Sequence, residues 1–300
     1  MTPRFSIILP TYNRASFIQK TISSVLLQKF KNWELIIIDD GSTDNTREII
    51  GQYNDTRIQY IYQENAERSV ARNNGIKNAN GNYICFLDSD DYYLPNHLAD
   101  LDQFLISHSN PIGLINFGCY LEKNNNKKIF NVKPITNNNQ IEYFFTNPTP
   151  PIRVCLHNSI LQKYNFDEDI LITEDTCLWM KVVNSFPVFT SNHLGVVYNV
   201  HDENSVNRKK PGALKTYSGL KVFFKRNSDI KKAIHPKVYA SWISQLMTNI
   251  AIYYIINNQS LKAVFWVFRA FITSPIHIHT RFRIVLLLYI FKIKKTPYFL

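Results

Sequence analysis

The sequence predicts an α/β fold, in which a mainly parallel sheet of Rossmann type is flanked by helices and followed by a C-terminal helical extension. Over the first hundred residues, short apolar runs alternate with segments whose apolar residues recur at helical spacing, which is the rhythm of βαβ units. Beyond Pro211 the pattern becomes helical, aromatic and basic.

Four apolar runs predict the first strands. They are Phe5–Leu9, Glu34–Ile38, Arg57–Tyr62 and Tyr83–Leu87. Helical spacing predicts the connections between them: Ser16–Lys29, a helix from the turn at 39–42 through Ile50, and Ser69–Asn78. Because a helix joins each pair of strands, the strands should be parallel, with helices on both faces of the sheet.

The second half of the chain is less regular. Polar tracts at Asn124–Lys128 and Thr136–Gln140 are expected to be loops, residues 147–151 a rigid turn, and Thr173 to about Asn184 a short helix. Three amphipathic helices should follow: Leu214–Arg226, Pro236–Asn257 and Ser260–Ile272. We expect one domain over 1–205, in two halves (1–110 and 111–205), and an extension over 206–300.

Composition narrows the class of protein. A chain of 300 residues with 45% hydrophobic and 19% charged residues can bury a core, so wholesale disorder is excluded. We find no signal-peptide pattern, and the apolar run Ile284–Phe291 is far shorter than the roughly 20 residues of a membrane span. The four cysteines, 22 to 36 residues apart, argue against a thiolate zinc site and predict buried thiols in a reducing, cytoplasmic compartment.

Charge is divided unevenly along the chain. Residues 1–202 have a net charge of −4, whereas residues 203–300 contain 17 Lys and Arg against 2 acids, a net charge of +15. This asymmetry predicts a separate partner for the extension, and we favour an anionic membrane surface. Nucleic acid is the weaker choice, because the aromatic residues recur at helical spacing and are expected in the core. The alternative to a binding role is a helical subdomain whose lysines are simply solvated.

Polar and acidic residues follow three of the predicted strands. They are Pro10-Thr-Tyr-Asn-Arg14, Asp39-Asp-Gly-Ser-Thr-Asp44 and Asp88-Ser-Asp-Asp91. Each alone is explained by a turn and a helix cap. In an open parallel sheet, however, ligands bind beyond the carboxyl ends of the strands. Asp88 and Asp90 are two apart, which in extended backbone points both carboxylates to one side, as a site for Mg²⁺ or Mn²⁺ requires.

Four ordered strings carry a resemblance to a known family: Ser6-Ile-Ile-Leu-Pro-Thr-Tyr-Asn-Arg14, Ile37-Ile-Asp-Asp-Gly-Ser-Thr-Asp44, Ala71-Arg-Asn-Asn-Gly75 and Phe86-Leu-Asp-Ser-Asp-Asp91. The sequence resembles the inverting glycosyltransferase family 2, of the bacterial cell-surface polysaccharide type, whose members have the GT-A fold. The resemblance is nearly continuous over 5–95, weaker to about 205, and does not extend to 206–300.

The resemblance implies roles for the matching positions. The nucleotide-sugar donor would be bound by Pro10, Thr11, Tyr12, Asn13, Arg14, Asp40, Arg72, Asp88 and Ser89. Within this set, Asp40 would accept a hydrogen bond from the base, Arg72 would approach the base or the diphosphate, and Asp88 would contact the ribose side. The metal, Mn²⁺ or Mg²⁺, would be bound by Asp90.

The string Thr173-Glu-Asp-Thr-Cys-Leu-Trp179 resembles the family's Glu-Asp motif, in which the Asp is the general base. Inversion needs one group to deprotonate the acceptor hydroxyl as it attacks the anomeric carbon. We assign this role to Asp175 in preference to Glu174. Without the family, the same residues are explained by a helix start capped by Thr173, with acids in its first turn.

His201 follows Asp175 by 26 residues. Many family members have a metal-binding histidine at about this place, so its imidazole is expected to complete the shell begun by Asp90. An exposed histidine beside acids is the ordinary alternative. The family often has Arg two residues earlier, where this chain has Asn199; Arg208 or Lys209 could replace it.

The sequence therefore predicts a cytoplasmic, metal-dependent glycosyltransferase, hexosyl- or N-acetylhexosaminyl-type, that moves a sugar from a nucleotide donor, with UDP favoured, onto a carbohydrate or lipid-linked acceptor. A nucleotidyltransferase would need a Gly-rich loop after the first strand, and Pro10–Arg14 contains no glycine. A non-catalytic sugar- or membrane-binding scaffold is the other alternative, and the acids Asp88, Asp90 and Asp175 argue against it.

Overall fold

The computed structural model describes residues 2–133, 135, 139–201 and 211–275. The chain divides into two compact units, residues 1–201 and 202–300. The domain boundary expected at 205 lies outside the described residues, as do Arg208 and Lys209.

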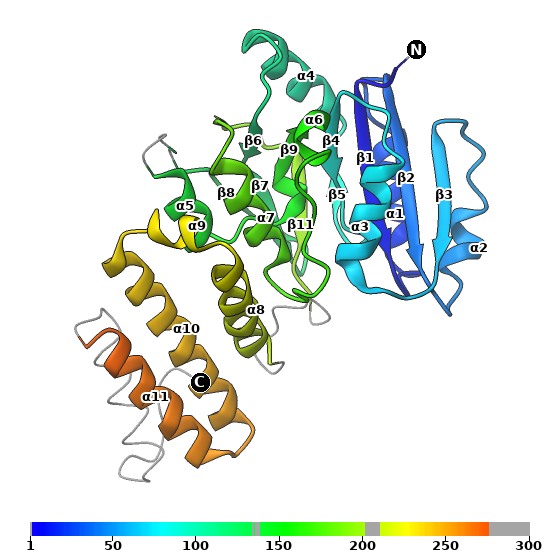
Figure 1. Ribbon diagram of the computed structural model, residues 1–300. Helices are drawn as coiled ribbons and strands as arrows, with labels where there is room; N and C mark the ends of the chain where they lie inside the picture. The colour runs from blue at the N-terminus through cyan, green and yellow to red at the C-terminus, as the bar shows by residue number, and fades with distance from the viewer. Residues whose placement is uncertain (1, 134, 136–138, 202–210, 276–300) are drawn as a thin grey trace. The chain divides into compact units, whose positions relative to one another are not determined.

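The first unit is built on a seven-stranded sheet with the order β10-β6-β9-β4-β1-β2-β3 (Figure 1). Its strands, in chain order, are β1 (Phe5–Thr11), β2 (Trp33–Asp40), β3 (Ile58–Gln63), β4 (Tyr83–Phe86), β6 (Leu114–Phe117), β9 (Val154–His157) and β10 (Val188–Ser191). Only β9 runs antiparallel to its neighbours among these strands. The expected mainly parallel sheet is thus confirmed, and the carboxyl ends of β1, β2 and β4 share one edge.

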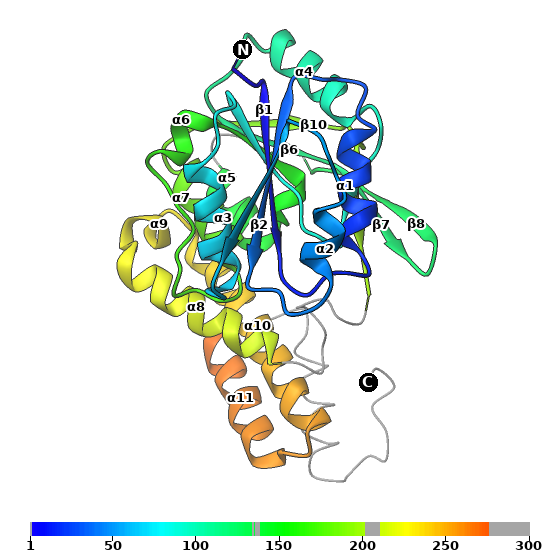
Figure 2. The same ribbon diagram turned by 90° about the vertical axis from the view of Figure 1, so that its right-hand side faces the viewer.

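Helices cover both faces of this sheet (Figure 2). Those of the first unit are α1 (Ile18–Leu26), α2 (Thr46–Ile50), α3 (Glu67–Lys77), α4 (His97–Ser107), α5 (Gln140–Thr146), α6 (Asn158–Leu161) and α7 (Glu174–Val183), with a 3₁₀ turn at Pro151–Arg153. Alternate residues of β2 face opposite sides: Leu35 and Ile37 belong to the core under α1 and α4, whereas Ile36 and Ile38 pack with Ala71 of α3. Two-sided burial explains why these strands read as continuous apolar runs.

A smaller sheet joins β5 (Tyr92–Tyr93), β11 (Val196–Asn199), β7 (Cys119–Lys123) and β8 (Asn126–Phe130) in that order. The expected loop at Asn124–Lys128 is wrong, because β7 and β8 form a hairpin there. Asn124 and Asn125 have φ angles of 49° and 62°, which the two central residues of a tight hairpin turn require and which Asn tolerates. The buried thiols are confirmed, since all four cysteines are buried and free.

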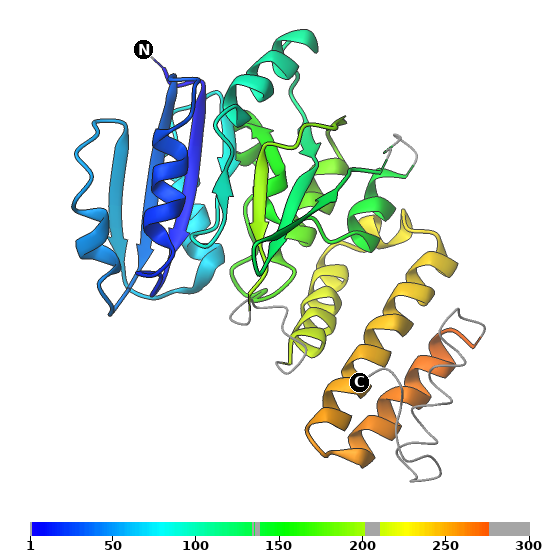
Figure 3. The same cartoon turned by 180° about the vertical axis from the view of Figure 1, so that it is seen from behind.

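The second unit contains α8 (Gly212–Arg226), α9 (Ser228–Lys232), α10 (Pro236–Ile256) and α11 (Ser260–Thr273), close to the expected ranges. Helices α10 and α11 lie side by side and antiparallel (Figures 1 and 3). The aromatic residues Phe223 and Phe224 are buried, as helical spacing predicted. Across the described part of the chain, none of the helices combines the length and the apolar character that a membrane crossing requires.

Candidate functional site

The loops after β1 and β2 are hydrogen-bonded to each other. Asn13 has a φ of 51°, its amide oxygen accepts from the backbone N–H of Thr43 (2.8 Å), and its own N–H donates to the Ser42 hydroxyl (3.0 Å). The N–H of Arg14 donates to the Thr46 hydroxyl at 2.9 Å. These contacts give the two loops a fixed relative position at the carboxyl edge of the sheet. Pro10 and Thr11, which were expected to bind the nucleotide-sugar donor, are buried, whereas Tyr12 is 46% exposed.

Asp40 is buried at the end of β2, and protein groups surround its carboxylate. Oδ1 accepts from the Gln63 side chain (2.7 Å) and from the N–H of Ala66 (2.9 Å), and Asn65 donates to Oδ2 at 3.3 Å. These bonds fix the orientation of the carboxylate at the end of β2. The expected contact of Asp40 with a nucleobase stays a prediction.

Asp88 and Asp90 follow β4 in a turn, closed by a hydrogen bond from the N–H of Asp91 to the carbonyl of Asp88 at 3.0 Å. The expectation that both carboxylates point to one side of an extended segment is therefore wrong. The turn directs Asp88 toward Arg72 and Asp90 toward His201, with contacts of 2.7 and 2.9 Å. Ser89 is buried, and its carbonyl accepts from the Thr21 hydroxyl at 3.0 Å.

Arg72, on α3, is 2% exposed and binds two acids. Its Nη2 lies 2.7 Å from Oδ1 of Asp88, and its Nη1 lies 2.8 Å from Oε1 of Glu174. The helix that carries it sits close to the sheet, because Gly75 faces Ile8: an added Cβ would lie 2.4 Å from the isoleucine Cγ2. The close approach of α3 thus brings a buried cation to the carboxyl edge.

Helix α7 starts at this edge with two acids. Thr173 precedes it with a φ of 76°, a strained conformation for a β-branched residue. The alternative explanation, a helix start capped by the Thr173 side chain, is wrong in its cap, because that side chain makes no cap hydrogen bond, although both acids do lie in the first turn. Glu174 is buried, and Asp175 is partly buried. Loss of water raises the pKa of Asp175 to about 7, and the Glu174 charge beside it acts in the same direction. Such a carboxyl group can accept a proton near neutral pH.

His201 meets Asp90 although 111 positions separate them: Nε2 lies 2.9 Å from Oδ2. The imidazole stacks on Phe17, with ring centroids 4.9 Å apart, and Nε of Arg14 lies 3.9 Å from the same carboxylate oxygen. Asn199, where the family often has Arg, donates its backbone N–H to Oδ1 of Asp91 at 2.8 Å. This bond ties the end of β11 to the aspartate turn and so positions His201.

The donor set of Asp90 and His201 fits a divalent cation. Within the described ranges, no three His, Cys, Asp or Glu side chains gather as a complete metal site. A cation held by one carboxylate and one imidazole keeps positions for water and for phosphate oxygens, which is how Mg²⁺ and related ions bind nucleotides. The imidazole nitrogen favours Mn²⁺ over Mg²⁺.

We call the carboxylates gathered here the acid rim: Asp88, Asp90, Asp91, Glu174 and Asp175. Asp91 is 1% exposed, and burial raises its pKa well above the usual range. Sequence reasoning missed three contributors: the buried role of Glu174, the stacking of Phe17 and the backbone bond of Asn199. The residue types gave no signal for the last two, since both depend on long-range contacts.

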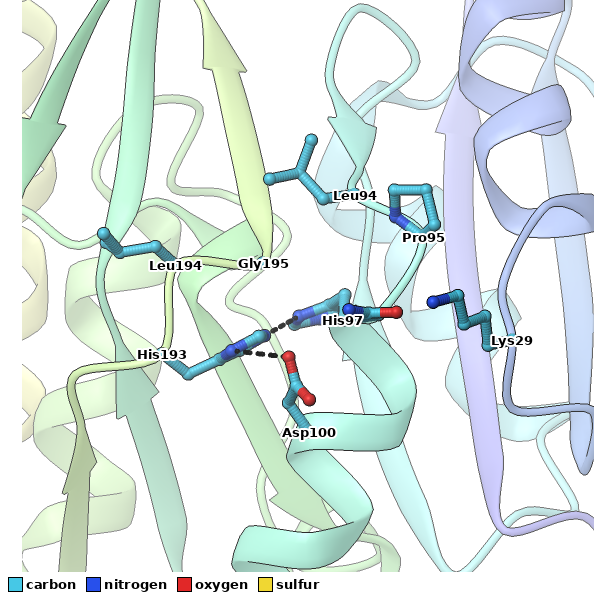
Figure 4. Close-up of a pocket in the computed structure, with 9 residues that line it drawn as sticks. Lys29, Leu94, Pro95, His97, Asp100, His193, Leu194 and Gly195 are labelled. Carbon is cyan, nitrogen blue, oxygen red and sulfur yellow. Dashed lines mark hydrogen bonds and ion pairs between the residues drawn. The ribbon is translucent and has the colours of Figure 1, made fainter.

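A cavity of about 590 Å³ lies apart from these residues (Figure 4). It is lined by Lys29, Leu94, Pro95, Asn96, His97, Asp100, His193, Leu194 and Gly195. Its polar centre is the histidine pair, His97 and His193, whose Nδ1 and Nε2 atoms lie 3.0 Å apart. Asp100 lies 3.4 Å from Nδ1 of His193. None of these residues belongs to the predicted site.

Comparison with known proteins places the sequence among glycosyltransferases. The model of the family described as glycosyl transferase family 2 matches residues 6–171, more than half of the chain. The chain is 33% identical over 214 residues to an uncharacterised glycosyltransferase of Rickettsia typhi, covering 69% of this chain and 67% of that protein. Two other Rickettsia relatives, 35% identical, are matched over only 30% of their own length.

A further relative is WfgD of Escherichia coli, a UDP-Glc:alpha-D-GlcNAc-diphosphoundecaprenol beta-1,3-glucosyltransferase. It is 35% identical over 182 residues, covering 59% of this chain and 69% of WfgD.

Two solved structures share the fold. S. aureus TarS 1-349 in complex with UDP-GlcNAc has a TM-score of 0.64 at 18% identity, over 91% of this chain and 82% of that one. The mannosyltransferase PcManGT of Pyrobaculum calidifontis, with GDP-Man and Mn²⁺, has a TM-score of 0.59 at 16% identity, over 97% and 86%. At these identities the likeness concerns the fold, and it confirms the expected GT-A-like architecture.

Proposed function

This chain belongs to glycosyltransferase family 2, and from that premise we propose that it transfers a sugar from a nucleoside-diphosphate donor to an acceptor hydroxyl with inversion. The observation that carries the proposal is the convergence at one sheet edge of Asp88, Arg72 and Asp175, which come from three separate segments. A buried cation among carboxylates and a carboxyl group with a pKa near neutrality are the groups that a displacement at phosphate-activated carbon requires.

We propose a UDP-sugar as the donor. The support is the fold shared with TarS, which was solved with UDP-GlcNAc, and the relative WfgD, whose name specifies UDP-Glc. A hexosyl or N-acetylhexosaminyl donor is consistent with both names. The nucleobase of the donor would lie against the loops that follow β1 and β2, where the buried carboxylate of Asp40 can accept a hydrogen bond from an imide N–H of the nucleobase.

Asp90 and His201 would hold the divalent cation, and Mn²⁺ is our first choice. When bound, the cation offsets the negative charge that develops on the departing diphosphate. Arg14 would add a donor at the same place, since its Nε lies near the Asp90 carboxylate. The solved mannosyltransferase with Mn²⁺ supports this choice of metal.

Asp175 would act as the general base. Its carboxylate removes the proton from the acceptor hydroxyl while the acceptor oxygen forms a bond to the anomeric carbon. The bond between that carbon and the diphosphate oxygen breaks on the opposite face, and the nucleoside diphosphate leaves. The configuration at the anomeric carbon is inverted by this single displacement.

We further propose that the acceptor is a saccharide of a surface polysaccharide or glycolipid, and that the second unit docks the enzyme on the cytoplasmic face of an anionic membrane. Residues 211–275 contain nine Lys and Arg and one acid. Four apolar side chains share one face of α11 at spacings of four, three and four: Leu261, Phe265, Phe268 and Ile272, with exposures of 53–89%. Basic residues near anionic lipid contribute on the order of 1 kcal/mol each.

Vesicle flotation tests the docking. We expect binding to vesicles with anionic lipid, loss of binding at high salt, and weaker binding by the double variant Leu261→Glu/Phe268→Glu. The matched control is Lys29→Glu in the first unit, which should bind like the parent. Equal binding to neutral vesicles would contradict the proposal.

The activity is tested with a panel of nucleotide-sugars, measured as release of nucleoside diphosphate with Mn²⁺ and with a chelator. We expect metal-dependent release from at least one UDP-sugar, and thermal stabilisation by UDP that requires the cation. No release and no stabilisation across the panel would instead support a non-catalytic scaffold.

A further inference from the structure

Glu174 is placed unlike an ordinary acid in the first turn of a helix. Such residues gain from the helix dipole at the surface, where water solvates them. Glu174 is instead 4% exposed, and its carboxylate contacts Nη1 of Arg72 at 2.8 Å and lies 3.9 Å from Nε of Arg68. Burial of a carboxylate directly beside a second acid, Asp175, costs free energy, so a helix-start role alone does not account for it.

Arg72 links Glu174 to the donor side of the site. Its planar guanidinium binds Asp88 through one terminal nitrogen and Glu174 through the other, at 2.7 and 2.8 Å. It lies 5.3 Å from the ring centre of Phe166, and its Nε is buried without a hydrogen-bond partner in the described part of the chain. Because the nitrogens of a guanidinium are rigidly connected, a change at Glu174 moves the donor group that faces Asp88.

We propose that Glu174 is a positioning residue of the transfer reaction: it holds Arg72 against the donor-side carboxylate of Asp88 and keeps a second negative charge beside the base Asp175. This inference rests on the proposed function, and it adds a role for the acid that precedes the base. The strained backbone at Thr173 supports it, since this conformation starts the helix with Glu174 turned into the protein.

The charge on Glu174 has a predictable effect on the base. The ionised groups near Asp175 are Glu174 on its own helix, Arg72 on α3 and Asp88 after β4; Arg72 acts against the two acids. Tyr198 of β11 also lies near, and its pKa is raised, so it is neutral at working pH. Removing the Glu174 charge leaves Arg72 to favour the ionised form of Asp175, so the base should work at lower pH.

Two substitutions separate the effect of the Glu174 charge from the effect of its side-chain length. Glu174→Gln keeps the length and can still accept from Arg72, but it removes the charge. Glu174→Asp keeps the charge but draws the carboxylate back from Arg72. In Glu174→Gln we expect the acid limb of the kcat profile to move down by roughly one pH unit, with kcat on the plateau within 10-fold of the parent. In Glu174→Asp the limb should stay near its original pH, while KM for the donor rises roughly 3- to 10-fold.

Glu48→Gln, an exposed acid on α2, is the matched control and should match the parent in both measurements. A Glu174→Gln enzyme with an unchanged pH profile, whether or not its Tm falls, would overturn the inference and leave the proposed function intact. A loss of more than 100-fold at every pH in Glu174→Gln, with activity kept in Asp175→Asn, would make Glu174 the base and overturn both this inference and the assignment of Asp175 as the base. A parent enzyme without transfer activity would remove the proposed function itself.

Discussion

Two groups of ionisable side chains are buried in the sheet-containing unit, and they differ in what surrounds them. The acid rim places five carboxylates near one fully buried guanidinium, beside a strained residue. The histidine pair, in contrast, is uncharged: burial lowers the pKa of His97 well below its usual value, and burial also lowers that of His193. The two rings stack on each other with centroids 5.2 Å apart, and His97 contacts Tyr93 and Phe117 in tilted arrangements.

This difference separates the proposed site from a structural feature. Both histidines are uncharged because burial lowers their pKa values, and their rings pack against neighbouring side chains. The fold therefore needs no ligand at this position, although the cavity beside the pair is large. At the acid rim, burial raises the pKa of Asp91 and Asp175, and the remaining acids contact Arg72 and His201, so charged groups converge there that a cation and a donor with N–H groups would use. We therefore expect the functional region at the acid rim, where charged groups from separate segments meet, and not at the cavity.

The sharpest test of the contrast compares one acid from each region. Asp175→Asn keeps the shape of the side chain but cannot take a proton, so turnover should fall about 10²–10⁴-fold with donor affinity nearly unchanged. Asp100→Asn, at the histidine pair, should keep turnover within about twofold, since that side chain is 47% exposed and its ionic partner in the described part of the chain is His193. Initial rates of nucleoside diphosphate release measure both. Normal turnover in Asp175→Asn would move the base to Glu174 or Asp169.

Binding of the metal should depend on Asp90 and His201 and not on the histidine pair. Asp90→Ala removes one of the two proposed protein ligands, so the Mn²⁺-dependent thermal stabilisation by UDP should disappear, a loss of a few kcal/mol at most. His97→Asn should lower the Tm without added ligand but keep the Mn²⁺-dependent increment. If Asp90→Ala responds to UDP and Mn²⁺ like the parent protein, the cation binds elsewhere.

A substitution at Gly195 should affect stability alone. A Cβ there would lie 2.0 Å from Nε2 of His193 and 2.5 Å from Nδ1 of His97, so Gly195→Ala must displace the pair. We expect a loss of about 1–3 kcal/mol of unfolding free energy, with kcat per folded molecule unchanged. Denaturant unfolding and initial rates give the two values. A large fall in kcat would mean that the histidine pair is coupled to the acid rim.

The contributions of the two regions to the free energy of unfolding should also change with pH in opposite directions. His97 stays neutral when folded, so its contribution is complete above the unfolded pKa of about 6.5 and is lost as the pH falls below it. Asp175, whose folded pKa of about 7 exceeds its unfolded value, binds a proton more readily when folded and so gains stability as the pH falls from about 7 toward 4.

Unfolding curves between pH 5 and 8 separate these contributions. Asp175→Asn should be more stable than the parent at pH 8, on the order of 1 kcal/mol, because an unfavourable buried charge is gone. His97→Asn should flatten the loss of stability below pH 6.5. A parent-like pH dependence in both variants would contradict the assigned shifts.

The sequence by itself determined the first four strands of the sheet, the helices that connect them and the family. Strands buried on both faces must be continuously apolar, and their connecting helices must show helical spacing, so local pattern and fold agree. The bounds of the strands β1 to β4 were predicted to within two residues at either end. The hairpin at Asn124 and Asn125 escaped prediction because left-handed Asn residues make the turn while polar side chains cover the strands.

Only the tertiary structure decided how the acids are used. Spacing suggested that Asp88 and Asp90 act on one side, but the turn sends them to partners 16 residues before and 111 residues after them in the chain. The burial of Glu174 and the raised pKa of Asp175 likewise depend on α3 and α7 meeting at the sheet edge. The electrostatic environment of a side chain is set by groups that are distant in the sequence. Motifs in the sequence therefore indicate which residues are candidates for the site, but the role of each candidate depends on its contacts in the tertiary structure.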